Sequence, residues 1–452
     1  MWQNSPQSSL VVTLFMLATA MFAMLSNGCA VGTQYCAVVG VFPSQPPRVE
    51  QTKPKVNIAV ELPATEQIAG CFYAIDRSTL DRRRPLDRGP ILLLPTEVVL
   101  FEATFKISPR DALTLCKIRL LKALSFSGDD VAVPKEALSL LSALDISAMF
   151  LFQCSCAQEL LSAFAKNLRH VSVGGNALSP EAVLALGQAE GLSSLKMSHA
   201  DWDVGLFEPL ARLKSIKKLA MFNCRSGWKM GWIRDWPLTS IEVSQTNLEP
   251  GEYAQLASLC LESVAVEQAN VSTLIWLREM PTLRQMRITR CPDLTLTEIS
   301  TISEMRNLVC LTISNQESLR PADLLFIGSL TELENLALSG ITFGPRAEIE
   351  ATSNLLRCIC LLPRLRRLDV SYSSGFSPRL VQVLVDNECR VEEVLGVGTA
   401  FGIVELEILS QLKHLKLIEI GDPQQSGDGP LSKREEESFR DAHPNIQLLV
   451  HR

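Results

Sequence analysis

The chain has 452 residues, 47% of them hydrophobic, and a formal net charge of −6. The hydrophobic content argues against disorder over most of the chain, and the acidic balance argues against a nucleic-acid-binding protein, which needs a concentrated basic face. Among the 13 cysteines there is no C-x-x-C, and the two C-x-C pairs, Cys154/Cys156 and Cys358/Cys360, lack partners at zinc-site spacing. We therefore expect neither a metal site nor a cofactor.

The N-terminal segment carries a targeting pattern. Residues 10–25 (LVVTLFMLATAMFAML) hold no charge and no proline, which is the length of a signal-peptide core and short of the roughly 20 residues of a spanning helix. The following Ser26, Asn27, Gly28 and Cys29 resemble the lipobox of bacterial lipoproteins, although Ser26 stands where an aliphatic residue is usual. We predict that residues 1–29 are a signal peptide or membrane anchor, with Cys29 as the lipidation site.

This pattern predicts an exported or cell-envelope protein that touches the membrane only through its N-terminal segment. The first basic residue of the chain is Arg48, so the segment lacks the usual flanking positive charge. Three forms stay open, namely a cleaved signal, a lipidated Cys29 and an uncleaved anchor. If the hydrophobic run is not a targeting signal, the protein is cytoplasmic.

Two segments lie between this N-terminal targeting segment and the repeats. Residues 30–55, with PSQPPRVEQTKP at 43–54, read as a proline-rich linker. Residues 56–119 read as an N-terminal cap of mixed structure, with a strand-like VNIAVEL at 56–62 and an apolar run at 91–105. Within that run, Val98-x-x-Phe101-x-Ala103 lies 23 residues before Leu121 and has the spacing of a degenerate first repeat.

Residues 120–452 are organised as a repeat. The pattern L-x-x-L-x-L recurs with aliphatic substitutions from Leu121 to a last unit at Ile446/Leu449, at a mean spacing of about 25 residues, within the leucine-rich range of about 20–29. The clearest units are Leu168-x-x-Val171-x-Val173, Leu192-x-x-Leu195-x-Met197 and Ile216-x-x-Leu219-x-Met221.

Each unit predicts one strand followed by one helix. Alternate strand residues face one side, so x-L-x-L directs two aliphatic groups inward. The second halves have helical spacing and predict inward faces that include Val183, Leu184 and Leu186 in one unit and Leu324, Leu325, Ile327 and Leu330 in another. One such unit cannot bury its apolar face alone, so neighbours must stack. The charged stretch at 431–445 predicts a polar C-terminal cap.

Three positions after the last aliphatic residue of many units stands a residue that can end the strand with local hydrogen bonds: Cys154, Asn176, Cys224, Thr246, Cys291 and Thr399. Together with this strand-ending position, the L-x-x-L-x-L pattern resembles the leucine-rich-repeat family over roughly 330 of 452 residues. The resemblance implies an α/β solenoid with a curved parallel sheet on the concave side and helices or irregular turns on the convex side. Ala200, Ala269, Ile341 and Pro423 depart from the consensus at this position.

One unit is rich in tryptophan. Trp228, Trp232 and Trp236 are four residues apart and share one face of a helical turn. They form either an aromatic platform for a partner or the core side of their unit. Their spacing equals that of the aliphatic core positions elsewhere, which favours the core.

The sequence indicates a recognition scaffold and no catalytic residues. The five histidines fall in no catalytic or metal-binding motif, and no G-x-S-x-G, P-loop, G-x-G-x-x-G or H-E-x-x-H occurs. On the concave face, outward positions align as a polar strip suited to a protein or glycan partner: His199, Asn223, Gln245, Gln268, Arg290 and Asn315, with Lys196 and Phe222 beside them. The alternatives are a structural spacer without a specific ligand and an intracellular adaptor.

Overall fold

The computed structural model divides the chain into two units, Met1–Val56 and Asn57–Arg452. The predicted signal, Cys29 and the linker to residue 55 lie outside the described residues. The structure describes the following ranges: 58–62, 71–76, 83–86, 89–93, 97–104, 106–118, 120–175, 179–199, 204–224, 230–246, 255–268, 277–278, 280–291, 294, 296–316, 319–343, 349–421 and 431–451.

A long parallel sheet forms the second unit. Each strand pairs in parallel with the next in chain order, which is the arrangement expected of stacked strand-and-helix units. The strands are β5 (Glu97–Ala103), β6 (Leu121–Ser127), β7 (Ala148–Phe152), β8 (His170–Gly174), β9 (Ser194–Ser198), β10 (Lys218–Phe222), β11 (Ser240–Ser244), β12 (Ser263–Glu267), β13 (Gln285–Thr289), β14 (Cys310–Ser314), β15 (Asn335–Ala337), β16 (Arg367–Asp369), β17 (Glu393–Val397), β18 (Leu417–Gly421) and β19 (Gln447–His451).

The sheet is open at both ends. Among the described strands, β19 pairs only with β18. At the other end β2 (Cys71–Asp76) pairs antiparallel with β5, and β3 (Arg83–Pro85) pairs antiparallel with β2. The strands β1 (Ile58–Leu62) and β4 (Gly89–Leu93) form a separate antiparallel pair.

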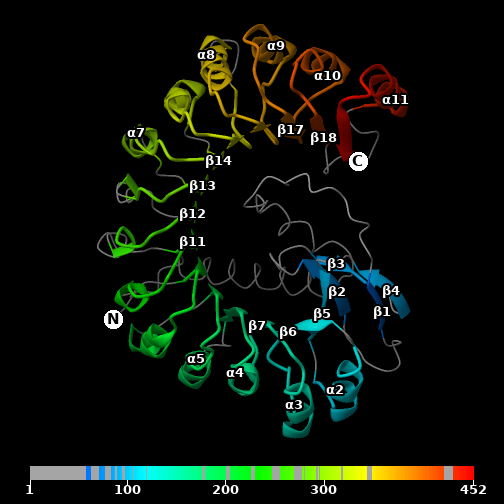
Figure 1. Ribbon diagram of the computed structural model, residues 1–452, viewed down its shortest axis with the longest axis vertical. Coiled ribbons are helices and arrows are strands. Elements are labelled where there is room, and N and C mark those ends of the chain that lie inside the picture. Colours follow the sequence, from blue (N-terminus) through cyan, green and yellow to red (C-terminus); the bar gives the residue numbers. More distant parts are fainter. Residues whose placement is uncertain are drawn as a thin grey trace, which may run out of the picture. The chain divides into compact units, whose positions relative to one another are not determined.

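The helices follow the strands and lie on the outer side, with the sheet on the inner side (Figure 1). This arrangement confirms the α/β leucine-rich-repeat solenoid that the repeat predicted. None of the helices in the described ranges is long and apolar enough to cross a membrane. They are α2 (Pro109–Leu115), α3 (Lys135–Leu141), α4 (Ala157–Phe164), α5 (Pro180–Leu186), η2 (Val204–Arg212), η3 (Met230–Ile233), α7 (Leu296–Ser303), η5 (Pro321–Ser329), α8 (Ile349–Cys360), α9 (Pro378–Asp386), α10 (Ile403–Leu409) and α11 (Lys433–Ala442), where η marks a 3₁₀ helix.

The strand register follows the aliphatic pattern. Leu219 and Met221 of β10 are buried against the helices, and in the pairing they stand level with Leu195 and Met197 of β9. The residues between them face the inner side and are exposed or half-buried. The shared apolar interior therefore runs through the repeats as one cluster, which includes Leu124 of β6 and Leu448 of β19.

Two helical interpretations need correction. Leu184 of α5 is 54% exposed and Leu325 of η5 is 40% exposed, although both were expected to face the core. In η5 the buried residues are Pro321, Leu324 and Ile327, followed by Leu330. Their spacing of three matches the three residues per turn of a 3₁₀ helix, so the residue next to Leu324 points away from the core.

The last unit also has a different register from the predicted one. Ile418 of β18 stands level with Leu448, which is buried, whereas Leu449 faces the inner side and is 37% exposed. The prediction of Ile446/Leu449 as inward positions was therefore wrong for Leu449. A one-residue shift in a strand exchanges its two faces, so the predicted register placed every residue of this strand on the wrong face of the sheet.

The first parallel strand, β5, lies within the segment that the sequence assigned to the cap. It pairs with β6 so that Phe101 stands level with Leu124, and the register shifts between Val99 and Leu100. Because of that irregularity Val99, not Val98, stands level with Leu121. Repeat geometry therefore begins at Glu97.

A second, smaller apolar cluster occupies the inner side of the first strands. It contains Ile75 of β2, Val98 and Leu100 of β5, Ala123 of β6 and Ala148 of β7, all buried, with Tyr73 and Phe150 packed against them. Alternate residues of these strands, such as Phe72 and Phe101, belong to the main core. The N-terminal strands thus carry apolar side chains on both faces, as strands buried on both sides do.

The last repeat contains the charged helix α11, which precedes the final strand β19. Ser432 caps α11 in a reciprocal box with Glu435, whose carboxylate accepts from the Ser432 N–H at 2.9 Å. Phe439 is the buried residue of this helix, and Arg440 donates to the carbonyl of Leu448 at 3.0 Å. The helix therefore covers the end of the core with one aromatic ring and turns its charges outward.

Candidate functional site

The predicted site residues form a column with one unusual backbone conformation. His199, Asn223, Gln245, Gln268, Arg290 and Asn315 each follow directly after a strand, and each has a φ between 46° and 53°. The same position holds Gln153, Gly175, Gly340, Tyr372 and Gly398 in other repeats, again with positive φ. We call this set the left-handed column.

The left-handed turn serves the stacking of repeats. It directs each backbone N–H of the six predicted residues to a carbonyl of the following repeat, at 2.8 to 3.0 Å; for example, His199 donates to Phe222. Left-handed φ favours glycine and tolerates asparagine and histidine better than β-branched residues. The residue types of this column are thus partly dictated by the backbone. The polar pattern in the sequence did not by itself indicate this requirement.

The side chains of the column remain on the surface. His199, Gln245, Gln268, Arg290 and Asn315 are exposed and Asn223 is half-buried. The amide groups of Gln245 and Gln268 contact each other across adjacent repeats. The structure therefore brings the six predicted residues into one line on consecutive repeats, at the carboxyl ends of β9 to β14.

Lys196 and Phe222 lie next to this line on the inner face. The Lys196 Nζ stands 4.3 Å from the centroid of the Phe222 ring, which is a cation–π distance. Phe152, which was not predicted, takes the same strand position as Phe222, and its ring meets His199 edge-on at 5.8 Å between centroids. Its signal in the sequence was its place directly before Gln153, as Phe222 precedes Asn223.

The strand-ending position of the consensus has a structural role. Cys224 is 1% exposed, and its thiol donates to the carbonyl of Phe222 at 3.4 Å. Thr246 accepts from the Cys224 N–H at 3.2 Å, and Thr399 donates to Val370 at 2.7 Å. Ile341, a departure from the consensus, is buried, and its N–H donates to the Ser373 hydroxyl of the next repeat at 3.3 Å. These side chains connect neighbouring repeats.

The two tryptophans of this unit that the structure describes, Trp232 and Trp236, pack on the core side. Trp236 is 3% exposed, and its indole N–H donates to the carbonyl of Leu210 at 3.2 Å. Trp232 is half-buried between Phe207 and Trp236, with ring centroids 5.1 and 4.9 Å away. Trp228 lies outside the described residues.

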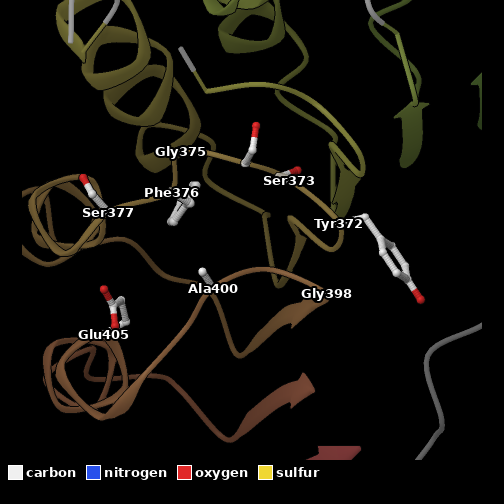
Figure 2. Close-up of a pocket in the computed structure, with 9 residues that line it drawn as sticks. Tyr372, Ser373, Gly375, Phe376, Ser377, Gly398, Ala400 and Glu405 are labelled. Carbon is white, nitrogen blue, oxygen red and sulfur yellow. The ribbon is translucent and has the colours of Figure 1, made fainter. Parts of the chain in front are cut away.

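A cavity of about 470 Å³ opens beside β16 and β17 and was not foreseen. Figure 2 shows Tyr372, Ser373, Phe376 and Glu405 around it. Glu405 is 8% exposed and accepts from the Gly402 N–H at 2.9 Å, so it caps α10. The cavity lies between the repeats that contain β16 and β17, and the Ser373 hydroxyl in its lining donates to the Leu338 carbonyl at 2.9 Å.

Two thiol pairs stand close together in the interior. The sulfur atoms of Cys154 and Cys156 are 3.4 Å apart, and their hydrogen bond lowers the pKa of Cys154 and raises that of Cys156. Cys360 and Cys389 are similarly hydrogen-bonded, which raises the pKa of Cys360. Across the described ranges, no group of three or more histidine, cysteine or acidic residues could hold a metal ion.

Comparisons with known proteins give structural likenesses only. No protein-family model and no curated protein sequence matches the chain. Among solved structures, yeast Rad7 in its complex with Elc1 has a TM-score of 0.44 at 15% identity and covers 69% of this chain and 82% of its own. A leucine-rich-repeat protein of Leptospira interrogans has a TM-score of 0.38 at 15% identity, covering 77% and 94%. An internalin of Listeria monocytogenes has a TM-score of 0.37 at 15% identity, covering 71% and 85%. At these values none of the three assigns a partner or an activity to this chain.

Proposed function

We propose that this protein is a non-enzymatic scaffold that holds a protein partner on the inner face of its sheet. One observation carries the proposal: six polar side chains of the left-handed column stand in register on consecutive repeats, five of them exposed. Adjacent strands are about 4.8 Å apart, so the column is an evenly spaced row of hydrogen-bonding groups. The hydrogen bonds that link each repeat to the next fix the backbone of the row before any partner arrives, which reduces the ordering cost of binding.

The proposal is tested by removing side chains without disturbing the backbone. We choose His199→Gly, Asn223→Gly and Gln268→Gly together, because glycine adopts the positive φ of these positions without strain. The wild type and the triple variant are cross-linked in cells, and captured proteins are quantified by mass spectrometry. We expect partners of the wild type to fall by about tenfold or more, since central interface side chains carry most of the binding energy.

A matched control separates the inner face from the outer one. Gln158, Glu181 and Gln411 are exposed on the helical side, and their combined change to alanine should leave capture unchanged. If the glycine variant retains every partner of the wild type, the inner-face proposal fails. A chain that captures no partner in either form favours the spacer alternative.

We also propose that the protein works in the cell envelope, anchored through residues 1–29. The uncharged run at 10–25 and the small residues before Cys29 support this location. Cell fractionation of the full chain should recover it with membranes, and Cys29→Ser should release it if lipid is the anchor. Recovery of the wild type in the cytosol would instead favour the intracellular adaptor.

A further inference from the structure

One part of the inner face combines aromatic rings with lysines. Phe152 on β7, Lys196 on β9, His199 directly after β9, and Lys218 and Phe222 on β10 form a set that we call the aromatic–lysine patch. Phe152, Lys196, His199 and Lys218 are exposed, and Phe222 is half-buried. The patch borders the first residues of the left-handed column, so it belongs to the face that the proposed function uses.

The patch is built by close packing across a glycine. A Cβ at Gly174 would come within 2.9 Å of the Phe152 ring and 2.2 Å of the Ser198 hydroxyl. The missing side chain at Gly174 therefore lets the Phe152 ring lie across β8 and reach His199 on the far side. On the next strand pair Lys196 lies over Phe222. Both rings are thus held in place by their neighbours.

The two lysines stand at a defined spacing. Lys218 stands level with Ser194, two residues before Lys196 on the neighbouring strand, so the two lysines extend from the same face of adjacent strands. An extended peptide places the side chains of residues i and i+2 on one side, about 7 Å apart. A Glu-x-Glu segment therefore presents two carboxylates on the side that faces the two lysines, whose flexible side chains carry their ammonium groups to them.

Several basic side chains elsewhere on the inner face lie next to a carboxylate. Arg287 contacts Glu242, Arg367 lies 3.4 Å from Glu393, and His451 lies 2.7 Å from Glu419. Within the described ranges, Lys196 and Lys218 have no carboxylate within 4 Å. Burial, followed by the positive charges of Lys218 and Arg169, lowers the pKa of His170.

We infer that the aromatic–lysine patch selects an acidic, aromatic segment of the protein partner, with two carboxylates on Lys196 and Lys218 and apolar side chains against Phe152 and Phe222. The inference rests on the proposed function and names the chemistry that the partner presents there. Two surface lysines without a carboxylate neighbour among the described residues, beside one exposed and one half-buried ring, are what such a segment would neutralise and cover.

A nucleic acid fits this face less well. A nucleic acid that extended from the patch across the successive strands would bring its phosphates near Asp369, Glu393 and Glu419, which face the same side on β16 to β18. The chain as a whole carries a net charge of −6. Two cations on β9 and β10, with acidic side chains further along the same sheet, suit a short acidic segment and not a long polyanion.

Peptide binding to the full chain tests the inference. Three fluorescein-labelled probes are compared by fluorescence anisotropy: a short peptide with a central Glu-Gly-Glu flanked by phenylalanines, its Lys-Gly-Lys counterpart, and a thymidine oligonucleotide of equal length. We expect binding of the acidic peptide alone, weakening as ionic strength rises. The variant K196E/K218E should lower its affinity by about tenfold or more, and K196Q/K218Q by less.

The matched control is K135E/K166E, which makes the same charge change at exposed positions on the helical side and should retain the affinity. Equal binding of the oligonucleotide, no binding of the acidic peptide, or unchanged affinity in K196E/K218E would each overturn the inference. The proposed function would survive these results if the glycine variant of the left-handed column still loses its partners in cells.

Discussion

At the residue scale, the repeats depend on positions that tolerate a left-handed backbone. Glycine, asparagine, glutamine, histidine, arginine and tyrosine occupy the left-handed column. The left-handed turn directs the backbone N–H toward a carbonyl of the next repeat. Gly398 is one of the constrained glycines of the column. Its φ is +70°, and a Cβ there would lie 2.5 Å from the ring of Tyr372.

Gly398→Ala should therefore lower the free energy of unfolding by roughly 1–3 kcal/mol, because it adds left-handed strain to a clash with Tyr372. Urea unfolding measures the loss. Gly231→Ala is the control, since the nearest atom to its Cβ is 3.9 Å away. Equal, small effects at both positions would show that the turn after β17 is not fixed as described.

His170 predicts a pH dependence of stability. Burial, Lys218 and Arg169 lower its pKa in the folded protein below the 6.5 of an unperturbed histidine. The unfolded chain then binds the proton more tightly, so this group makes stability fall as pH drops below about 6.5. His170→Gln should reduce the loss of unfolding free energy between about pH 7.5 and 5.5, whereas the exposed, non-titrating change Gln411→Ala should follow the wild type. A variant curve parallel to the wild type would contradict this assignment.

At the element scale, the helical halves of the repeats differ in period. The α-helical units bury residues on a face of 3.6-residue spacing, whereas η5 buries every third residue from Pro321 to Leu330. Repeats of similar length can thus carry different helices on their outer side. The sequence pattern alone does not distinguish them, because Leu324 and Leu325 both match a helical apolar stripe.

Leu324→Ala should cost about 2–5 kcal/mol, since its side chain is fully buried and its loss leaves a cavity. Leu325→Ala should change stability little, because that side chain is 40% exposed. Thermal and urea unfolding of the two variants check the difference. Comparable losses would indicate an α-helix at this place instead of a 3₁₀ helix.

At the scale of the whole molecule, each repeat of the second unit is stabilised mainly by its neighbours. The C-terminal end is closed by α11, whose Phe439 is fully buried. Phe439→Ala should cost about 3–5 kcal/mol locally. Hydrogen exchange should rise in α11, β18 and β19 and stay unchanged in β6 to β8, while Glu437→Ala, on the exposed side of α11, should alter neither. A uniform rise along the chain would mean that the repeats unfold as one cooperative unit.

The candidate site was partly foreseen. The residues His199 to Asn315 were identified because they share one position in each unit, and a shared position becomes a row once parallel strands align in register. Phe152 was missed because its approach to His199 depends on Gly174, a contact between three repeats. The cavity beside Tyr372 was missed because its lining comes from two neighbouring repeats, one contributing Tyr372 and Phe376 and the other Gly398 and Glu405.

The spacing of aliphatic residues by itself determined the parallel strands, their order and most of their register, because a unit with one apolar face must stack on its neighbours. Only the tertiary structure decided the positive φ of the residue after each strand, the 3₁₀ helix at 321–329, the register of β19 and the inner-face cluster around Leu100. These features depend on contacts between repeats or between the two faces of the sheet. A periodic pattern within one unit does not encode such contacts.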